Sequence, residues 1–543
     1  MTATLSHAVG PTTAPLLEET IGATLRSTAA RLPDGEALVV PFQDVRMTWA
    51  VLDAEVDRVA KALLALGLGA GDRAGIWSPN CAEWVLLQMA TARVGVVLVT
   101  LNPAYRTHEV TYAIRLSGCK ALFSATVHKT SDYRSMVAEI RSALGDLEHV
   151  VHIGSDEWAA FVARGADVGG DVLAASEATV RASDPVNIQF TSGTTGNPKG
   201  ATLSHRNILN NGWFVGHGCA YTDADRVCIP VPFYHCFGMV MGNLACISHG
   251  ATMVIPAPSF EAAATLKTVV DERCTSLYGV PTMFIAILDL PDVDTADTTS
   301  LRTGIMAGSP CPVEVMKQAM DRLGITDVTI CYGMTETSPV STQTAVDAPI
   351  DKRVGTVGTV HPHVEVRIID PASGTVVSRG ETGELCTKGY SVMSGYWADP
   401  QRTLEAIDTD GWMHTGDLAT MDDEGYIAIV GRSKDMIIRG GENISPREIE
   451  EFLFTHDDVV DVQVVGVPDA RFGEEVMAFV RPRAGAIIDA AAVREFCTGR
   501  IAHYKIPRYV EMIDEMPMTV TGKIQKYVLR EIAVDRLGQT PPP

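Results

Sequence analysis

One ten-residue stretch, TSGTTGNPKG at 191–200, contains the residue types of a loop that binds anions. Its hydroxyl groups and the backbone N–H groups of its glycine turns can surround phosphate oxygens, and Lys199 supplies a positive charge. The preceding VNIQF (186–190) reads as a strand and the following SHRNILNNGWF (204–214) as a helix. The stretch therefore predicts a phosphate site at the end of a parallel strand, with a mobile surface loop as the alternative.

Two familiar nucleotide motifs do not account for this chain. A Walker A loop needs glycine before its lysine and a hydroxyl after it, whereas Pro198 precedes Lys199 and Gly200 follows. GLGAGD at 67–72 follows a predicted helix and precedes a predicted strand, the reverse of the order in a dinucleotide fold. We interpret it as a helix end and turn, so the phosphate loop is of another kind.

A second stretch, residues 227–260, contains no Asp, Glu, Lys or Arg. It includes the segment PFYHCFGMVMG at 232–242, which is rich in aromatic residues and methionine. Much of the stretch is expected to be a buried helix, and a lone His235 is more often a core histidine than a functional one. An apolar wall with flexible methionines also suits an alkyl chain.

The surrounding elements alternate. Apolar, β-branched runs and helical patterns follow one another from 17 to 331, which predicts layered α/β architecture with largely parallel sheets in two similar subdomains. Short strands separated by Gly, Asp and Pro turns predict a small β region at 354–430. GRSKD at 431–435 marks a boundary. We predict an N-terminal domain over 1–431, a hinge at 432–434 and a small α+β domain over 435–543.

The start of one C-terminal helix has a specific signature. In NISPREIEEF, Ser445 is predicted to cap the helix, Pro446 to occupy its first position and Glu448 to complete a capping box.

Composition excludes several classes. The chain has 543 residues, too many for one core, and a formal charge of -22, which disfavours nucleic-acid binding. Its 11 cysteines include no Cys-x-x-Cys pair and read as reduced thiols of a cytoplasmic protein. No lysine or arginine precedes Arg26, unlike a secretory or transit leader, and no run of 18 apolar residues predicts a membrane span.

Five motifs together resemble the acyl-adenylate-forming superfamily. They are the phosphate loop, YGMTETSPV (332–340), HTGDL (414–418), GRSKDMIIRGGENISPREIE (431–450) and TGKIQKYVLR (521–530). They occur in the family's order and cover nearly the whole chain. Among its members, the sequence looks most like medium-chain fatty acyl-CoA ligases. The resemblance implies an AMP-forming acid–thiol ligase: a carboxylate and ATP give acyl-AMP and pyrophosphate, and CoA then gives acyl-CoA and AMP.

The resemblance also implies roles for individual residues. Catalysis is assigned to Lys523, Glu336, Thr335 and His235, with Glu336 as the Mg²⁺ ligand and His235 as a gate between the acyl pocket and the thiol tunnel. Nucleotide binding is assigned to Thr191, Ser192, Gly193, Thr194, Thr195, Gly196, Asn197, Pro198, Lys199, Gly308, Ser309, Pro310, Tyr332, Gly333, Asp417, Arg432 and Lys523. The acyl pocket is assigned to His235, Phe237, Met241, Ala307, Gly333 and Val340.

The resemblance further implies that the small domain alternates between two orientations, one for each half-reaction. Lys434, where some relatives carry Asp, is the expected hinge, and Arg439, Gly440 and Gly441 are expected to line the path of CoA. ATP, Mg²⁺ and CoA are the expected cofactors and co-substrates, and fatty acid metabolism is the expected setting.

Three alternatives stay open from the sequence. An aryl-CoA ligase or another carboxylate-activating enzyme would use the same motifs. A non-catalytic acyl- or nucleotide-binding protein would not need Lys523, Glu336 and Asp417 together. An amino-acid-activating domain would place an acid near the pocket, which the charge-free stretch lacks. The sequence does not determine the oligomeric state; a homodimer is one option.

Overall fold

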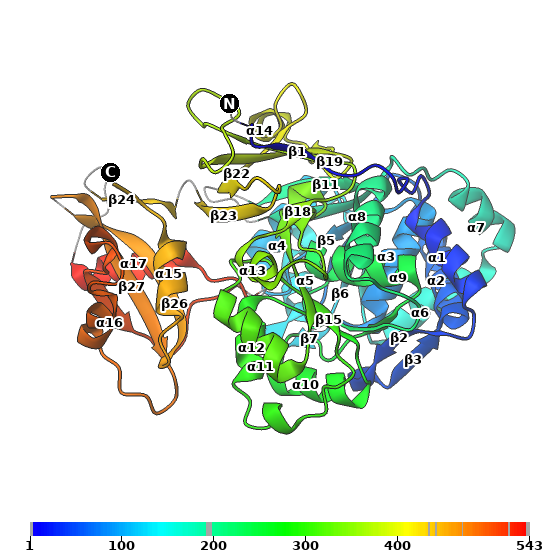
Figure 1. Cartoon of the computed structure of the whole chain (residues 1–543). Helices are drawn as coiled ribbons and strands as arrows, with labels where there is room; N and C mark the ends of the chain where they lie inside the picture. Colours follow the sequence, from blue (N-terminus) through cyan, green and yellow to red (C-terminus); the bar gives the residue numbers. More distant parts are fainter. Residues whose placement is uncertain are drawn as a thin grey trace.

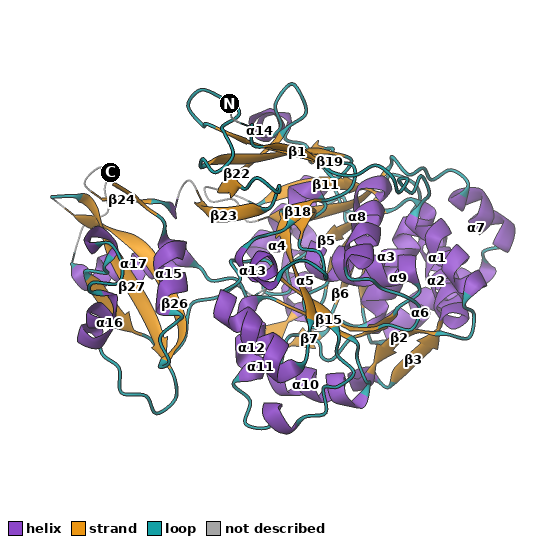
Figure 2. Cartoon of the chain, in the orientation of Figure 1, coloured by secondary structure: helices purple, strands orange, loops and turns teal. Residues whose placement is uncertain are grey.

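The structure, a computed structural model, describes residues 4–191, 198–432, 435–439, 442–469, 471–519 and 522–538. Among the described residues, a large N-terminal domain carries three sheets of five or more strands and one short hairpin, and a smaller α+β domain lies beside it (Figures 1 and 2). The predicted layered α/β class is confirmed. Within the described ranges, no helix has the length and apolar character needed to cross a membrane.

The first sheet has the strand order β21-β11-β10-β5-β4-β6-β9 among described strands. Its β10-β5-β4-β6-β9 part is parallel, as predicted, whereas β11 and β21 pair in antiparallel fashion. The bounds are β4 (Arg73–Trp77), β5 (Val97–Thr100), β6 (Ala121–Ser124), β9 (His149–His152), β10 (Pro185–Thr191), β11 (Lys199–Ser204) and β21 (Gly395–Tyr396). A short hairpin, β7 (Val127–His128) with β8 (Ser131–Asp132), stands apart.

The predicted strand at 186–190 and the predicted helix at 204–214 are confirmed as β10 and α8 (His205–Gly218), but the sequence did not predict β11 between them. The phosphate loop joins β10 to β11, and Thr191 pairs with Lys199. Helix α8 begins only after β11, with Ser204 as its N-cap. The two ends of the loop are therefore held by a hairpin, and the N-terminus of α8 does not follow the loop directly.

The second sheet has the order β18-β17-β16-β15-β14-β12-β13-β2-β3 among described strands, parallel from β16 to β2. Its strands are β2 (Glu36–Val40), β3 (Val45–Thr48), β12 (Arg226–Cys228), β13 (Thr252–Val254), β14 (Ser276–Gly279), β15 (Thr303–Ala307), β16 (Asp327–Gly333), β17 (Val340–Gln343) and β18 (Thr359–Val360). The carboxyl ends of β14, β15 and β16 lie at one edge of the sheet, the edge at which α/β proteins bind ligands.

Helices pack on and between the two sheets (Figure 2). One core cluster joins both sheets, because it includes Ala74 of β4 and Val227 of β12 together with residues of α1, α2, α3, α8 and α9. The helices of this domain are α1 (Ile21–Arg31), α2 (Trp49–Ala65), α3 (Ala82–Val94), α4 (Thr107–Ser117), α5 (Tyr133–Ile140), α6 (Asp156–Arg164), α7 (Gly170–Glu177), α8, α9 (Ala245–His249), α10 (Ala262–Asp271), α11 (Pro281–Leu288), α12 (Val313–Leu323), α13 (Ile350–Gly355) and α14 (Pro400–Ala406).

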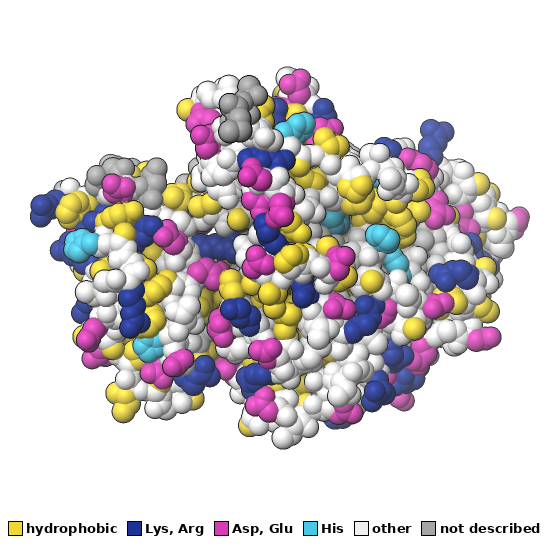
Figure 3. All heavy atoms as spheres, in the orientation of Figure 1, with side chains coloured by type: hydrophobic (Ala, Val, Ile, Leu, Met, Phe, Trp, Pro, Cys, Tyr) yellow, Lys and Arg dark blue, Asp and Glu magenta, His cyan; other side chains and the backbone are white. Residues whose placement is uncertain are grey.

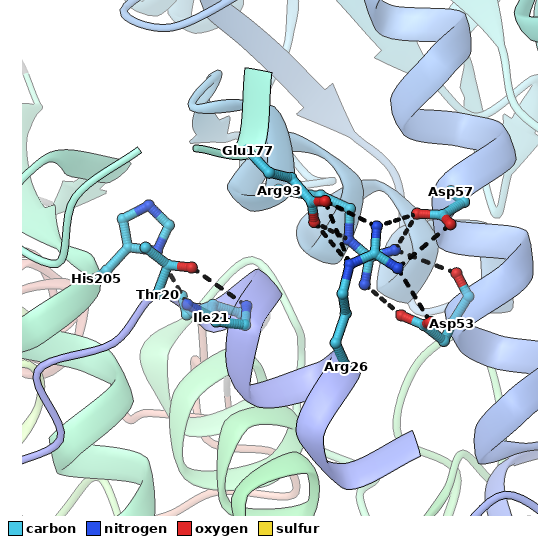
Figure 4. A network of polar contacts seen from close by, with 9 residues as sticks. Thr20, Ile21, Arg26, Asp53, Asp57, Arg93, Glu177 and His205 are labelled. Atoms are coloured by element: carbon cyan, nitrogen blue, oxygen red, sulfur yellow. Dashed lines mark hydrogen bonds and ion pairs between the residues drawn. The ribbon is translucent and has the colours of Figure 1, made fainter. Parts of the chain in front are cut away.

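A buried ion-pair network ties four of these helices together (Figure 4). Arg93 of α3 is fully buried, and its guanidinium pairs with Asp53 and Asp57 of α2 and with Glu177 of α7. Arg26 of α1 binds the same three carboxylates, and its Nη2 lies 2.8 Å from Asp57 Oδ1 and 2.9 Å from Glu177 Oε2. Two guanidinium groups, one fully buried and one partly exposed, thus neutralise most of the charge of three partly exposed acids.

The small β region predicted at 354–430 is an antiparallel sheet with the order β1-β19-β20-β22-β23 among described strands. It consists of β1 (His7–Val9), β19 (Val364–Ile369), β20 (Gly383–Gly389), β22 (Met413–Met421) and β23 (Ile427–Arg432). The sequence did not predict β1, which comes from the start of the chain and covers the edge of β19 (Figure 1).

The C-terminal domain has a sheet in which β25-β24-β27-β26 are antiparallel and β28 pairs with β27 in parallel. Its elements are β24 (Ile437–Arg439), β25 (Glu442–Ile444), α15 (Pro446–Leu453), β26 (Val459–Asp469), β27 (Gly473–Pro482), α16 (Ala490–Cys497), β28 (Tyr509–Met512) and α17 (Lys526–Leu537).

The start of α15 differs from the prediction. Ser445 is the N-cap residue and Pro446 the first helical residue, but Ser445 makes no side-chain cap. Its hydroxyl donates to the Val430 carbonyl at 2.6 Å, and Glu448 binds Lys505 instead of the helix start. The predicted capping box is wrong because Ser445 bonds to the large domain.

Charged side chains are distributed over the surface. On the face in Figure 3, acidic and basic groups are interspersed on both domains. On that face, the excess negative charge is not gathered into one patch.

Candidate active site

Glu336 is a buried carboxylate where the two main sheets meet. It lies in η6, a single 3₁₀ turn (Thr335–Thr337) directly after β16. Its Oε1 accepts hydrogen bonds from Tyr396 Oη at 2.8 Å and from Thr191 Oγ1 at 3.3 Å. Lys199 Nζ lies 4.8 Å from the centre of the Tyr396 ring. Both described ends of the phosphate loop therefore meet at Glu336.

Asp417 is held from two sides by polar groups. Tyr332 Oη donates to its Oδ2 at 2.7 Å, and Arg432 Nε lies 3.0 Å from its Oδ1. The carboxylate is largely buried. Burial, with a further contribution from Asp417, raises the pKa of the Tyr332 phenol, so this hydroxyl stays a hydrogen-bond donor. Tyr332 was assigned to nucleotide binding, and its hydroxyl holds the carboxylate of Asp417, another residue of that assignment.

Lys523 reaches into the large domain from the loop before α17. It is one of the residues that line a small cavity with Val231, Pro232, His235, Phe237, Val280 and Gly308. Burial lowers the pKa of the Lys523 ammonium and nearby Arg432 lowers it further, whereas Glu336 and Asp417 oppose the shift. The structure thus brings together Lys523, His235, Glu336 and Asp417, which lie far apart in sequence.

The loop that carries Lys523 is anchored at Gly522. Thr282 Oγ1, at the start of α11, donates to the Gly522 carbonyl at 2.9 Å. Gly522 has φ +76°, and a Cβ there would lie 2.8 Å from Val280 Cγ2. Only glycine fits this conformation and this close approach.

Further contacts between the domains surround this loop. The Val313 N–H at the start of α12 donates to Glu451 Oε2 of α15 at 3.3 Å. Arg447 of α15 donates to the Ile429 carbonyl at 2.9 Å. Together with the Ser445 bond, these contacts hold the small domain against the large one in the orientation that inserts Lys523.

His235 is a neutral imidazole in the cavity wall. Burial, together with the Lys523 charge, lowers its pKa to about 3. The Phe237 N–H donates to His235 Nδ1 at 3.1 Å, so the neutral ring carries its proton on Nε2.

The expected buried helix around Met241 is a π-helix, η4 (Phe237–Leu244), in which every residue is buried. The wider turn frees carbonyl groups for side chains: Tyr278 Oη donates to the Met241 carbonyl at 2.9 Å, and Gln88 Nε2 to that of Met239 at 3.0 Å. The Phe237 and Tyr278 rings stack with centroids 5.6 Å apart. Such π turns are often found at functional sites.

The remaining predicted pocket residues lie at the carboxyl ends of β15 and β16 or at the start of β17. Ala307 ends β15, and Gly308, Ser309 and Pro310 follow it. Gly333 ends β16, where a Cβ would lie 1.8 Å from the Pro339 carbonyl oxygen, and Val340 begins β17. The backbones of β15, β16 and β17 therefore lie together at this edge of the sheet, where the pocket was predicted.

Some predicted residues are not brought to this cavity or cannot be placed. Arg439 binds Glu475 through two nitrogens, at 2.8 and 2.9 Å, within the small domain. Ser192, Gly193, Thr194, Thr195, Gly196, Asn197, Lys434, Gly440 and Gly441 lie outside the residues that the structure describes.

Sequence reasoning missed three contributors, namely Tyr396, Thr282 and Gly522. Tyr396 lies in SGYWAD, and nothing in its spacing links it to Glu336. Gly522 was only part of a TGK turn. Each of the three becomes visible only when distant segments are folded together.

Known proteins resemble this chain over nearly its whole length. A model of the AMP-binding enzyme family matches residues 25–397, and one of the AMP-binding enzyme C-terminal domain matches 448–523. YngI of Bacillus subtilis (strain 168) is 47% identical over 96% of this chain and 98% of its own. Medium-chain acyl-CoA ligase ACSF2, mitochondrial, of Homo sapiens is 42% identical over 97% of this chain and 89% of its own. The crystal structure of ATP-bound MatB from Rhodopseudomonas palustris is 32% identical, covers 95% of this chain and 99% of its own, and superposes with a TM-score of 0.82.

Proposed function

The chain belongs to the AMP-binding enzyme family and is an AMP-forming acyl-CoA synthetase, and we propose that its preferred substrates are medium-chain fatty acids. The observation that carries the adenylation chemistry is the burial of Lys523 in a cavity walled by apolar residues, with Glu336 and Asp417 close enough to perturb its pKa. The medium-chain preference is supported by the ACSF2 relatives and by the uncharged wall around η4.

In the first half-reaction, Asp417 accepts hydrogen bonds from the ribose hydroxyls of ATP, and Tyr332 and Arg432 keep its carboxylate in place. Residues 191–199 surround the β- and γ-phosphates, and Thr335 donates to the α-phosphate. The fatty carboxylate attacks the α-phosphorus and pyrophosphate leaves. Lys523 lies between these two anions and stabilises the charge that builds up as they approach.

Glu336 is the residue that we propose to hold Mg²⁺. The donor set fits this ion, which is typically bound by one or two carboxylates together with substrate phosphates and water. When bound, Mg²⁺ would neutralise charge on the phosphates. Tyr396 and Thr191 orient the Glu336 carboxylate for this role.

In the second half-reaction, the CoA thiol attacks the acyl carbonyl and AMP leaves. We propose that the small domain first rotates about Lys434, withdraws Lys523 and brings Arg439, Gly440 and Gly441 toward the site. Since Lys523 shares the cavity with His235, its departure opens the region next to the imidazole. Our proposed boundaries remain 1–431, 432–434 and 435–543.

The acyl pocket is proposed to lie behind His235, among Phe237, Met241, Ala307, Gly333 and Val340. The cavity beside Lys523 has about 10 Å³ of free volume, room for about one water molecule. An alkyl chain must therefore displace side chains, which the unbranched methionines allow.

The decisive test is pyrophosphate release with ATP and a series of straight-chain acids. Each buried methylene contributes about 0.8 kcal/mol, roughly fourfold in affinity, so kcat/KM should climb from acetate to about eight or ten carbons and then level off. Met241→Trp should shorten the preferred chain and leave the reaction of a short acid unchanged. A flat profile, or a preference for acetate, benzoate or an amino acid, would contradict the medium-chain assignment.

Gly522→Ala should impair adenylation selectively. The new methyl group would collide with Val280, and the positive φ costs of order 1 kcal/mol in addition. We expect acyl-AMP formation to fall at least about tenfold, while supplied acyl-AMP still reacts with CoA at a near-normal rate. Rapid-quench measurement of each half-reaction checks this.

Gly485→Ala is the matched control for Gly522→Ala. Gly485 also lies in the small domain at φ +82°, but a Cβ there would meet nothing within 4 Å. Equal effects of the two substitutions would show that the anchor at Gly522 does not matter.

A further inference from the structure

The strand that carries Asp417 has an irregularity next to this residue. Strands β20 and β22 pair in antiparallel fashion, with Glu384 opposite Leu418 and Cys386 opposite His414. The distance of two residues from Glu384 to Cys386 along β20 therefore corresponds to four residues, from Leu418 to His414, along β22. The segment Thr415–Asp417, which has two residues more than the single Leu385 opposite it, bulges out of the β20–β22 ladder, and a bulge of this kind redirects side chains near functional sites.

The bulge leaves backbone groups without ladder partners, and two neighbouring side chains satisfy them. Thr415 Oγ1 donates to the Leu385 carbonyl at 2.6 Å and accepts the Asp417 N–H at 3.1 Å. The Gly416 N–H donates to Glu384 Oε1 at 3.1 Å. Gly416 has φ +70°, a left-handed conformation that favours glycine.

The second oxygen of Glu384 fixes the other end of the bulge. Glu384 Oε2 lies 3.2 Å from His414 Nδ1, and His414 Nε2 lies 3.6 Å from Asp408 Oδ2. One carboxylate thus binds His414, the paired residue directly before the bulge, and Gly416, the residue directly before Asp417. Its side chain is mostly shielded from solvent, which strengthens these bonds.

We infer that Glu384 is a positioning residue for ATP: it holds the Thr415–Asp417 bulge in the shape that presents the Asp417 carboxylate to the ribose. The inference rests on the proposed role of Asp417. In this role Glu384 acts through its bond to the Gly416 N–H.

The same side chains offer one other reading, a metal site. Ligand atoms of Glu384, Cys386 and His414 lie within 4.8 Å of one another. However, burial raises the pKa of the Cys386 thiol to about 12, so at neutral pH it is a poor ligand. Arg367 also donates a hydrogen bond to Asp408 at 3.0 Å, and this places a positive charge close to His414, which would repel a metal ion. These features favour a hydrogen-bonded support over a cation site.

The test compares Glu384→Leu with Glu384→Gln. The glutamine oxygen can still accept from Gly416 and its amide can donate to His414, whereas leucine can do neither. We expect Glu384→Leu to raise the KM for ATP about tenfold with a much smaller change in kcat, and Glu384→Gln to stay within about twofold of the wild type.

Deoxynucleotides separate positioning from general damage. With 2′-deoxy-ATP or 3′-deoxy-ATP, part of the contact with Asp417 is already lost, so the effect of Glu384→Leu should shrink to about threefold or less. An undiminished effect with these substrates, an unchanged KM in Glu384→Leu, or equal damage in Glu384→Gln would overturn the inference.

Controls cover the remaining outcomes. Glu365→Leu, on neighbouring β19 with a carboxylate 3.4 Å from His7, should leave the KM for ATP unchanged. One equivalent of Zn²⁺ bound by the wild type and lost in both Cys386→Ser and His414→Gln would replace the inference by a metal site. If the wild type releases no pyrophosphate with any acid, the proposed function itself is wrong. If the wild type turns over normally and Glu384→Leu has the same KM for ATP, only the inference about Glu384 is wrong.

Discussion

Lys523→Ala should reduce acyl-AMP formation by several powers of ten, about 4 kcal/mol or more of transition-state stabilisation. The Lys523 ammonium is buried in the cavity with His235, and Glu336 and Asp417 stabilise its charged form. Alanine would remove the one positive charge that the lysine places at this point of the cavity wall. Pyrophosphate release in a single turnover measures the loss.

The second half-reaction distinguishes an adenylation role from a general one. Acyl-AMP supplied to Lys523→Ala should react with CoA at a near-normal rate, because the proposed rotation removes Lys523 from the site. Lys505→Ala is a suitable control, since Lys505 makes a surface pair with Glu448 in the same domain. Equal losses in both half-reactions would contradict the two-orientation mechanism.

Arg93→Leu should destabilise the large domain by about 2–3 kcal/mol, toward the lower end of the cost of breaking a buried ion pair, because the three carboxylates stay partly exposed and keep Arg26 as a partner. The substitution leaves Arg26 alone with Asp53, Asp57 and Glu177, three carboxylates that link α2 to α7 (Figure 4). A shift of the urea unfolding midpoint, followed by circular dichroism, measures this effect.

A control for Arg93 is available on α2. Arg58 pairs with Glu55 at the surface, so Arg58→Leu should cost less than about 1 kcal/mol. If both substitutions shift the midpoint equally, the buried network does not hold the four helices together.

The regular parts of the fold could be predicted from the sequence, because hydrophobic periodicity is a local signal. Within the alternating pattern predicted from 17 to 331, the apolar runs EALVV and RAGIW form β2 and β4, and the helical pattern AEWVLLQMATAR forms α3. Strand β11 was missed because KGATLS is short and begins with Lys and Gly. It is a strand because it pairs with β10 on one side and with Gly395 and Tyr396, far along the chain, on the other.

The candidate site was predictable in residue type but not in arrangement. The motifs pointed to Glu336, Asp417 and Lys523, but their separation of up to 187 positions carries no distance information. The contact of Tyr396 with Glu336 and the anchor of Gly522 on Thr282 depend on long-range packing. Ser445 is a further example. The local sequence predicted that its side chain caps the helix, but its hydroxyl donates to the Val430 carbonyl of the other domain instead.

Strand β1 has a consequence for the ends of the molecule. Residues His7–Val9 occupy the edge of the small β sheet and pair with Val366 and its neighbours in β19. Without them, the outer N–H and C=O groups of β19 would be exposed, and an uncovered edge strand is a template for strands of other chains. Residues His7–Val9 therefore protect β19 from pairing with strands of other chains, which lowers the tendency of this sheet to aggregate.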